Sequence, residues 1–201
     1  MELFRFDAFV RASSPVLCGV DEAGRGPLAG DVYAAAVIFD DGLLIDGIND
    51  SKKLSEKKRE TLFDEITGKA RAYAIAKATV EEIETLNILQ ATFLAMRRAV
   101  EGLGCSVDLA LIDGNRLPPL PCEAECLIGG DAKSASIAAA SILAKVSRDR
   151  AMKALAERYP QYEFEKHKGY GTARHCELIR RYGPCEVHRH SFLRKLMEAR
   201  S

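Results

Sequence analysis

The sequence predicts an α/β fold in which a mixed five-stranded sheet is flanked by helices. Apolar runs of strand length alternate with longer segments whose apolar residues recur at helical spacing. The order is two strands, a helix, a strand, a helix, two strands and then further helices, which is typical of a sheet with helices packed on it. A length of 201 residues fits one such domain with a small addition.

The first strands are marked by apolar runs that end in polar or glycine-rich segments. Two of these runs flank a glycine-rich loop, and the fourth ends in an aspartate. The strands are expected at residues 16–22, 32–39, 71–79 and 109–112, with a fifth in the short apolar run before Gly129.

The helices are indicated by apolar faces and end signals. Ser55 is a suitable N-cap for the first, whose apolar face includes Leu62 and Ile66 and which stops near Gly68. The last two helices, 172–182 and 190–199, form a basic C-terminal helical extension. The chain is therefore expected to divide into residues 1–160 and 161–201. Helices are expected from Ser55 to Gly68 and over 86–101, 132–159, 172–182 and 190–199.

Composition excludes several classes of protein. The 29 basic residues balance 29 acidic ones, so any site for a polyanion must come from local clustering. No signal pattern and no membrane-length apolar stretch are present, which predicts a cytoplasmic protein without membrane contact. The six cysteines lack zinc-ligand spacing and are expected to be reduced thiols.

Asp21 and Glu22 are the most informative residues. They end an apolar strand, where ionised carboxylates lose hydration unless a cation or donor replaces it. Neighbouring residues on a strand point to opposite faces, so the two carboxylates share a site only if the strand bends or ends at Glu22. Carboxylates beside a glycine-rich loop indicate a divalent metal that holds a phosphate.

Asp113 and Asp131 extend this pattern, because each follows an apolar run at a glycine. In α/β sheets, functional residues gather where strands end, so all four acids are expected at one edge. Two Mg²⁺ or Mn²⁺ ions would relieve their mutual repulsion and activate a phosphate. The alternative is structural: an Asp before Gly is a common turn residue, and Asp131 could be a helix N-cap.

The loop around Gly24, Arg25 and Gly26 could press backbone amides against a sugar-phosphate. A strand rather than a helix follows, which excludes a dinucleotide fingerprint. Plain turn geometry with a solvated Arg25 is the alternative. Basic and aromatic residues that could contact nucleic acid are Ser51, Lys52, Lys53, Lys168 and Tyr170, with more positive charge near His188 and Arg189.

Taken together, these segments resemble the bacterial ribonuclease HII family over nearly the whole chain. The matching motifs are GVDEAGRGPLAG (19–30), DSKKL (50–54), IDG (112–114), GDAKS (130–134), AAASILAK (138–145) and HKGYGT (167–172).

The resemblance implies a ribonuclease H-like catalytic domain in residues 1–160 and a C-terminal helical subdomain that contributes to substrate binding. It implies cleavage of RNA in RNA–DNA hybrids, and nicking 5′ of single ribonucleotides in duplex DNA, with 5′-phosphate and 3′-hydroxyl ends. The matching metal-binding acids are Asp21, Glu22, Asp113 and Asp131. The Gly24–Gly26 loop matches the reader of the ribose 2′-hydroxyl, which a methyl group on Gly24 is expected to crowd. Tyr170 matches the aromatic that stacks on the next deoxyribose.

Two other functions stay open at this point. A DNA nuclease of the same architecture would also use the four acids, and a non-catalytic hybrid-binding module would not need them. A monomer is expected, and no motif identifies a protein partner.

Overall fold

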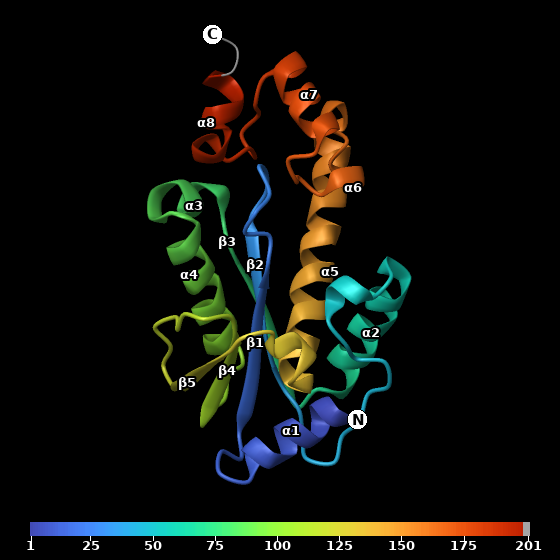
Figure 1. Cartoon of the computed structure of the whole chain (residues 1–201), viewed down its shortest axis with the longest axis vertical. Helices are drawn as coiled ribbons and strands as arrows, with labels where there is room; N and C mark the ends of the chain where they lie inside the picture. Colours follow the sequence, from blue (N-terminus) through green and yellow to red (C-terminus); the bar gives the residue numbers. More distant parts are fainter. Residues whose placement is uncertain (199–201) are drawn as a thin grey trace.

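The computed structural model describes residues 1–198 and confirms the mixed five-stranded sheet flanked by helices (Figure 1). The strand order is β3-β2-β1-β4-β5. β1 pairs antiparallel with β2 and parallel with β4, so the sheet is mixed at its centre. The strands are β1 (Leu17–Ala23), β2 (Val32–Ile38), β3 (Ala72–Ala78), β4 (Leu109–Asp113) and β5 (Glu123–Leu127).

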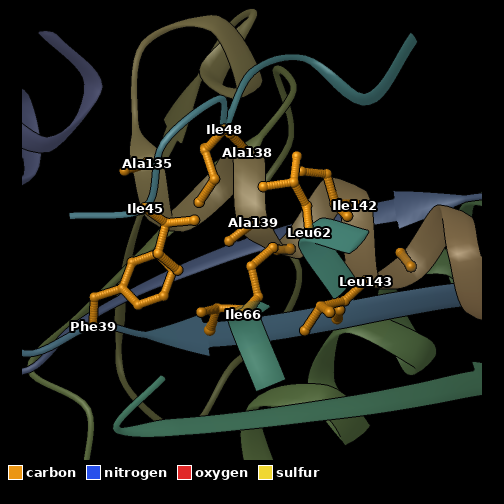
Figure 2. Close-up of a cluster of buried hydrophobic side chains, with 14 of the residues drawn as sticks. Phe39, Ile45, Ile48, Leu62, Ile66, Ala135, Ala138, Ala139, Ile142 and Leu143 are labelled. Atoms are coloured by element: carbon orange, nitrogen blue, oxygen red, sulfur yellow. The ribbon is translucent and has the colours of Figure 1, made fainter. Parts of the chain in front are cut away.

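Helices cover both faces of the sheet (Figure 1). On one face, α5 (Ala135–Arg158) and α2 (Glu56–Lys69) bury an apolar cluster that includes Phe39, Leu62 and Ile142 (Figure 2). On the other face, α4 (Ile88–Glu101) packs against Cys18, Val20 and the apolar side chains of β2. The alternation of side chains along β1 therefore serves two cores, which fixes the register of this strand.

Three helices lie beside the tip of the β1–β2 hairpin, at the opposite end of the molecule from α1 (Figure 1). They are α6 (Phe164–His167), α7 (Ala173–Tyr182) and α8 (His190–Glu198). The C-terminal helical region is thus present, although the last residue of the expected 190–199 helix lies outside the described residues. Of the helices that the structure describes, none combines the length and apolar character of a membrane span.

The structure corrects three sequence expectations. Helix α1 (Glu2–Arg11), which lacks a side-chain N-cap, was not expected. The helix predicted for 86–101 is α4, which begins at Ile88 because Asn87 has φ 70° and caps it, and the short helix α3 (Val80–Leu86) just before it was not expected. The helix predicted from residue 132 begins at Ala135 with Ser134 as its N-cap, which leaves Asp131 in a preceding 3-10 turn.

Candidate active site

Three of the predicted acids converge at one edge of the sheet. Oxygen atoms of Asp21, Asp113 and Asp131 all lie within 4.8 Å of one another. Asp21 is on β1 and Asp113 ends β4, and the parallel register that pairs Val20 with Ile112 places these two carboxylates at the same level. The strand pairing therefore brings together residues that are far apart in the sequence.

Asp131 is positioned by a tight turn rather than by a helix N-terminus. Gly129 adopts φ 63°, and the 3-10 turn Gly130–Ala132 follows it. The Gly130 N–H donates to Asp113 Oδ1 at 2.7 Å, which ties this turn to the end of β4. A Cβ on Gly130 would lie 2.5 Å from Ile137 Cδ1, so a larger residue here would have to displace the end of that side chain.

The electrostatics of the cluster favour cation binding. Burial raises the pKa of Asp21 well above its ordinary value, and the Glu22 and Asp113 carboxylates raise it further. Burial also raises the pKa of Asp131, again with a contribution from Asp113. Groups that resist ionisation in isolation gain the most from a nearby positive charge, so a divalent cation would reverse these shifts.

Glu22 lies beside this trio rather than within it. β1 continues to Ala23, so Glu22 follows the alternation of the strand, and no Glu22 oxygen joins the trio within 4.8 Å of one another. Its Oε1 accepts from Arg25 Nη1 at 3.5 Å. Burial raises the pKa of Glu22 while Arg25 opposes that shift. Glu22 thus sits at the end of the strand, where it borders cavities on both faces.

The two predicted lysines before α2 have different positions. Lys52 Nζ lies 3.8 Å from Asp131 Oδ2, and Lys52 lines a cavity together with Asp21 and Asp113. Burial opposes protonation of Lys52, but Asp131 and the other nearby carboxylates raise its pKa overall. Ser51 is buried and shares a 2.8 Å hydrogen bond with the Ser141 hydroxyl. Lys53 is exposed and does not line that cavity.

A cavity of about 240 Å³ joins the acids to the glycine loop. Its wall includes Asp21 and Asp113 as well as Gly24, Arg25 and Gly26. Tyr170 also lines this cavity and keeps 43% of its surface exposed. The cavity therefore unites an acidic end with a backbone-rich, aromatic end.

Lys168 is not brought into this cavity. Its Nζ donates to the carbonyl of Glu165 at 2.6 Å, and its own carbonyl accepts from Arg148. Lys168 adopts φ 51°, and the turn that this angle makes in the backbone leads the chain to Tyr170. Lys168 therefore contributes to the site through its backbone. A direct contact between this ammonium and substrate stays a prediction.

Residues of α5 complete the cavity and were not predicted. Ser141 and Lys145 line it, and Arg148 lies over the Tyr170 ring with its Cζ 5.7 Å from the centroid. A signal for them exists in the sequence, since positions 141, 145 and 148 fall on one face of the helix at helical spacing. Polar side chains in line on one face of a helix indicate that this face meets a polar site.

The donor set fits a hard divalent cation. Carboxylate oxygens are the ligands that Mg²⁺ and Mn²⁺ prefer, and no thiol or imidazole of the described residues shares the cluster. Asp21 is buried and hydrogen-bonded through Oδ1 to the Glu22 N–H at 2.7 Å, which fixes its orientation. This preorganised set of acids can hold a metal without rearrangement of the sheet.

Comparison with known proteins agrees with the geometry. The family model described as Ribonuclease HII matches residues 18–195. Ribonuclease HII from Burkholderia thailandensis is 59% identical over 181 residues, which covers 90% of this chain and 85% of that protein. The crystal structure of ribonuclease H2 from Pyrococcus horikoshii matches with a TM-score of 0.76 and 27% identity, and covers 91% of this chain and 97% of that one. A Bst ribonuclease HIII crystallised with Mn²⁺ shares the fold, with a TM-score of 0.72 at 19% identity over 92% of this chain and 70% of that one.

Proposed function

This chain belongs to the ribonuclease HII family and is an endoribonuclease of RNA–DNA hybrids; from this premise we propose that it also nicks duplex DNA on the 5′ side of a single ribonucleotide. The observation that carries the proposal is the shared cavity. It places the acids that handle a phosphate next to a loop and an aromatic ring that suit a sugar.

The glycine loop is proposed to select the ribose. Arg25 and Gly26 are exposed at the cavity, and a Cβ on Gly26 would meet only Tyr170 Cε1, at 3.9 Å. Backbone groups can therefore approach a 2′-hydroxyl, which is the group that distinguishes RNA from DNA. Tyr170 is proposed to stack on the deoxyribose that follows, because its ring is exposed and borders the same cavity.

The acids are proposed as the catalytic centre. Asp21, Glu22, Asp113 and Asp131 would hold two divalent ions, Mg²⁺ or Mn²⁺, which when bound supply positive charge to the scissile phosphate and lower the pKa of water. Asp21 would be the central ligand of this set, because it is the most deeply placed acid on β1. Hydrolysis on the 5′ side of the ribonucleotide would leave a 5′-phosphate and a 3′-hydroxyl.

The surrounding cations position the nucleic acid. Lys52 faces the acids from the 3-10 turn before α2 and provides positive charge close to the expected phosphate. Ser51 is held by Ser141 in the wall of the cavity. All these residues come from one chain, which supports a monomer as the active form.

The test is cleavage of a labelled DNA duplex that carries one ribonucleotide, with Mg²⁺ or Mn²⁺, beside an all-DNA duplex of the same sequence. Metal-dependent nicking 5′ of the ribonucleotide, without cutting of the control, is expected. Cutting of both duplexes would indicate a DNA nuclease of this architecture. Binding without cutting would indicate a non-catalytic module, and either result would overturn the proposal.

A further inference from the structure

Two fully buried arginines lie beneath the glycine loop, and the proposed chemistry does not use them. Arg189 precedes α8 and is 0% exposed, while Arg148 belongs to α5 and is 1% exposed. Arginine is almost never buried without partners, because the loss of hydration of its charge must be offset. The partners of both side chains are therefore informative.

Arg189 bonds the loop from below through its whole guanidinium. Its nitrogens donate to the carbonyls of Gly24, Arg25, Pro27 and Gly30 over distances of 2.6–3.0 Å. Its backbone N–H donates to the Leu28 carbonyl at 2.8 Å. A planar fork of five N–H donors is the group best suited to several carbonyls at once.

Arg148 completes the arrangement from α5. It donates to the carbonyls of Ala29 and Asp31 at 3.1 and 3.3 Å, and to Lys168 in the segment before Tyr170 at 3.0 Å. The loop is also joined to both neighbouring segments, through Leu28 N to the Gly169 carbonyl and Gly30 N to the Val187 carbonyl, each at 2.8 Å. Both arginines thus fix the loop relative to the aromatic ring.

The consequence is an orientation of the peptide groups. The carbonyls of the loop point inward to the guanidiniums. Among the residues that the structure describes, none accepts a hydrogen bond from the backbone N–H of Arg25 or Gly26, and both residues are exposed. Amides whose carbonyls are held on the protein side present their N–H groups to a ligand. Burial and the nearby Arg148 lower the pKa of Arg189 to about 9, so it keeps its charge at neutral pH.

We propose that Arg189 is a positioning residue for ribose selection, because its buried guanidinium holds the loop carbonyls inward and leaves the Arg25 and Gly26 amides facing the sugar. This inference rests on the proposed function of the loop. It assigns the C-terminal segment a role in specificity without contact with substrate.

The experiment measures selection in binding, apart from cleavage. All proteins carry Asp21→Asn, and the dissociation constants for a one-ribonucleotide duplex and an all-DNA duplex are compared. Arg189→Met is expected to bring the ratio of the two constants close to one, while the affinity for the all-DNA duplex stays unchanged. In the background with Asp21 intact, the same change should lower kcat/KM on the one-ribonucleotide duplex by roughly 10- to 100-fold, the cost of a misplaced contact.

Two further variants separate positioning from stability. Arg189→Lys keeps the charge but lacks the planar fork, so an intermediate ratio is expected, and it tests the idea if Arg189→Met does not fold. Arg11→Met removes a buried arginine at the other end of the molecule and should leave the ratio unchanged. If the ratio of the two dissociation constants is unchanged in both Arg189 variants, this inference alone is overturned. A reference protein with no preference for the ribonucleotide would overturn the proposed function as well.

Discussion

Lys52 Nζ lies 3.8 Å from Asp131 Oδ2, so a flexible cation faces the acid cluster from the 3-10 turn Ser51–Lys53 that precedes α2. Its side chain is 80% exposed and can move toward a phosphate in the adjacent cavity. Lys52→Met is therefore expected to raise KM by roughly five- to ten-fold, about 1–1.4 kcal/mol. It should also reduce the salt dependence of binding by about one counterion.

Lys53→Met is the matched control for this prediction. Lys53 is the neighbouring residue and is also exposed, but it does not line the cavity. Steady-state kinetics at several salt concentrations compare the two variants. Equal changes in KM and in salt dependence for the two variants would mean that both lysines act only through the overall electrostatic field of the protein.

Asp21→Asn is expected to lower cleavage by more than about 10³-fold while the fold is preserved. The amide fits the space of the carboxylate but is a poor ligand for a hard cation. Since burial and nearby carboxylates disfavour the charged form of Asp21, the variant should unfold at an equal or higher temperature than the wild type in EDTA. Calorimetry and a nicking assay check both parts. Asp64→Asn on the exposed face of α2 is the control and should change neither.

Tyr170→Ala is expected to reduce cleavage at a single ribonucleotide by about ten-fold, because a stacking contact contributes about 1–3 kcal/mol. Binding of an all-DNA duplex should change less. Tyr73 on β3 has a similar exposed fraction, 42% against 43%, but does not line the cavity, so Tyr73→Ala is a matched control. Equal, small effects on cleavage and plain binding would remove the stacking role.

The two loop glycines are expected to respond differently to alanine. A Cβ on Gly26 would have open space beside Tyr170, so Gly26→Ala should fold normally and reduce selection for ribose. Gly24 has φ 104°, and its Cβ would lie 2.2 Å from Arg148 Nε. Gly24→Ala should therefore destabilise the protein by about 1–3 kcal/mol through strain, rather than crowd a 2′-hydroxyl as expected from the sequence. Urea unfolding and a comparison of ribonucleotide with all-DNA duplex test both; a stable Gly24→Ala protein would contradict this account.

The positions of the acids could be predicted because their signal is local. Asp21 and Asp113 each end an apolar run, and parallel pairing of such strands places their ends together. Glu22 lines the same cavity as Asp21 and Asp113, but it lies outside the trio whose oxygens are within 4.8 Å of one another, and β1 continues past it to Ala23. The residue at which β1 ends decides how Glu22 lies relative to Asp21. Strand ends are the feature that a sequence pattern predicts least accurately.

The arginines beneath the loop could not be predicted in the same way. From the sequence, Arg189 counts as one more positive charge near the end of the chain, since arginine is mostly exposed. Its burial depends on carbonyls about 160 residues away that converge only in the folded protein. The division at residue 160 stays a prediction, and these contacts show that the segment after it shapes the loop of the first part.

A buried histidine pair behind Tyr170 makes stability depend on pH. His175 Nε2 lies 3.2 Å from His188 Nε2, and His175 Nδ1 lies 2.9 Å from the Tyr170 carbonyl oxygen. Burial lowers the pKa of both histidines to about 4, with His167 contributing to each shift. Because the unfolded value is about 6.5, the stabilisation is complete above that pH and is lost as the pH falls toward 4.

The size of that loss follows from the two shifts together. The contribution of this pair to the unfolding free energy should drop by a few kcal/mol between pH 7.5 and 4.5, since each pKa unit corresponds to about 1.4 kcal/mol. His175→Gln removes one of the two titrating groups and should reduce this drop by about half. His190 also lowers the pKa of His188, so His190→Gln should reduce the drop, but by less than His175→Gln does. Urea unfolding at both pH values measures the drop, and an unchanged drop in His175→Gln would assign the acid sensitivity to other groups.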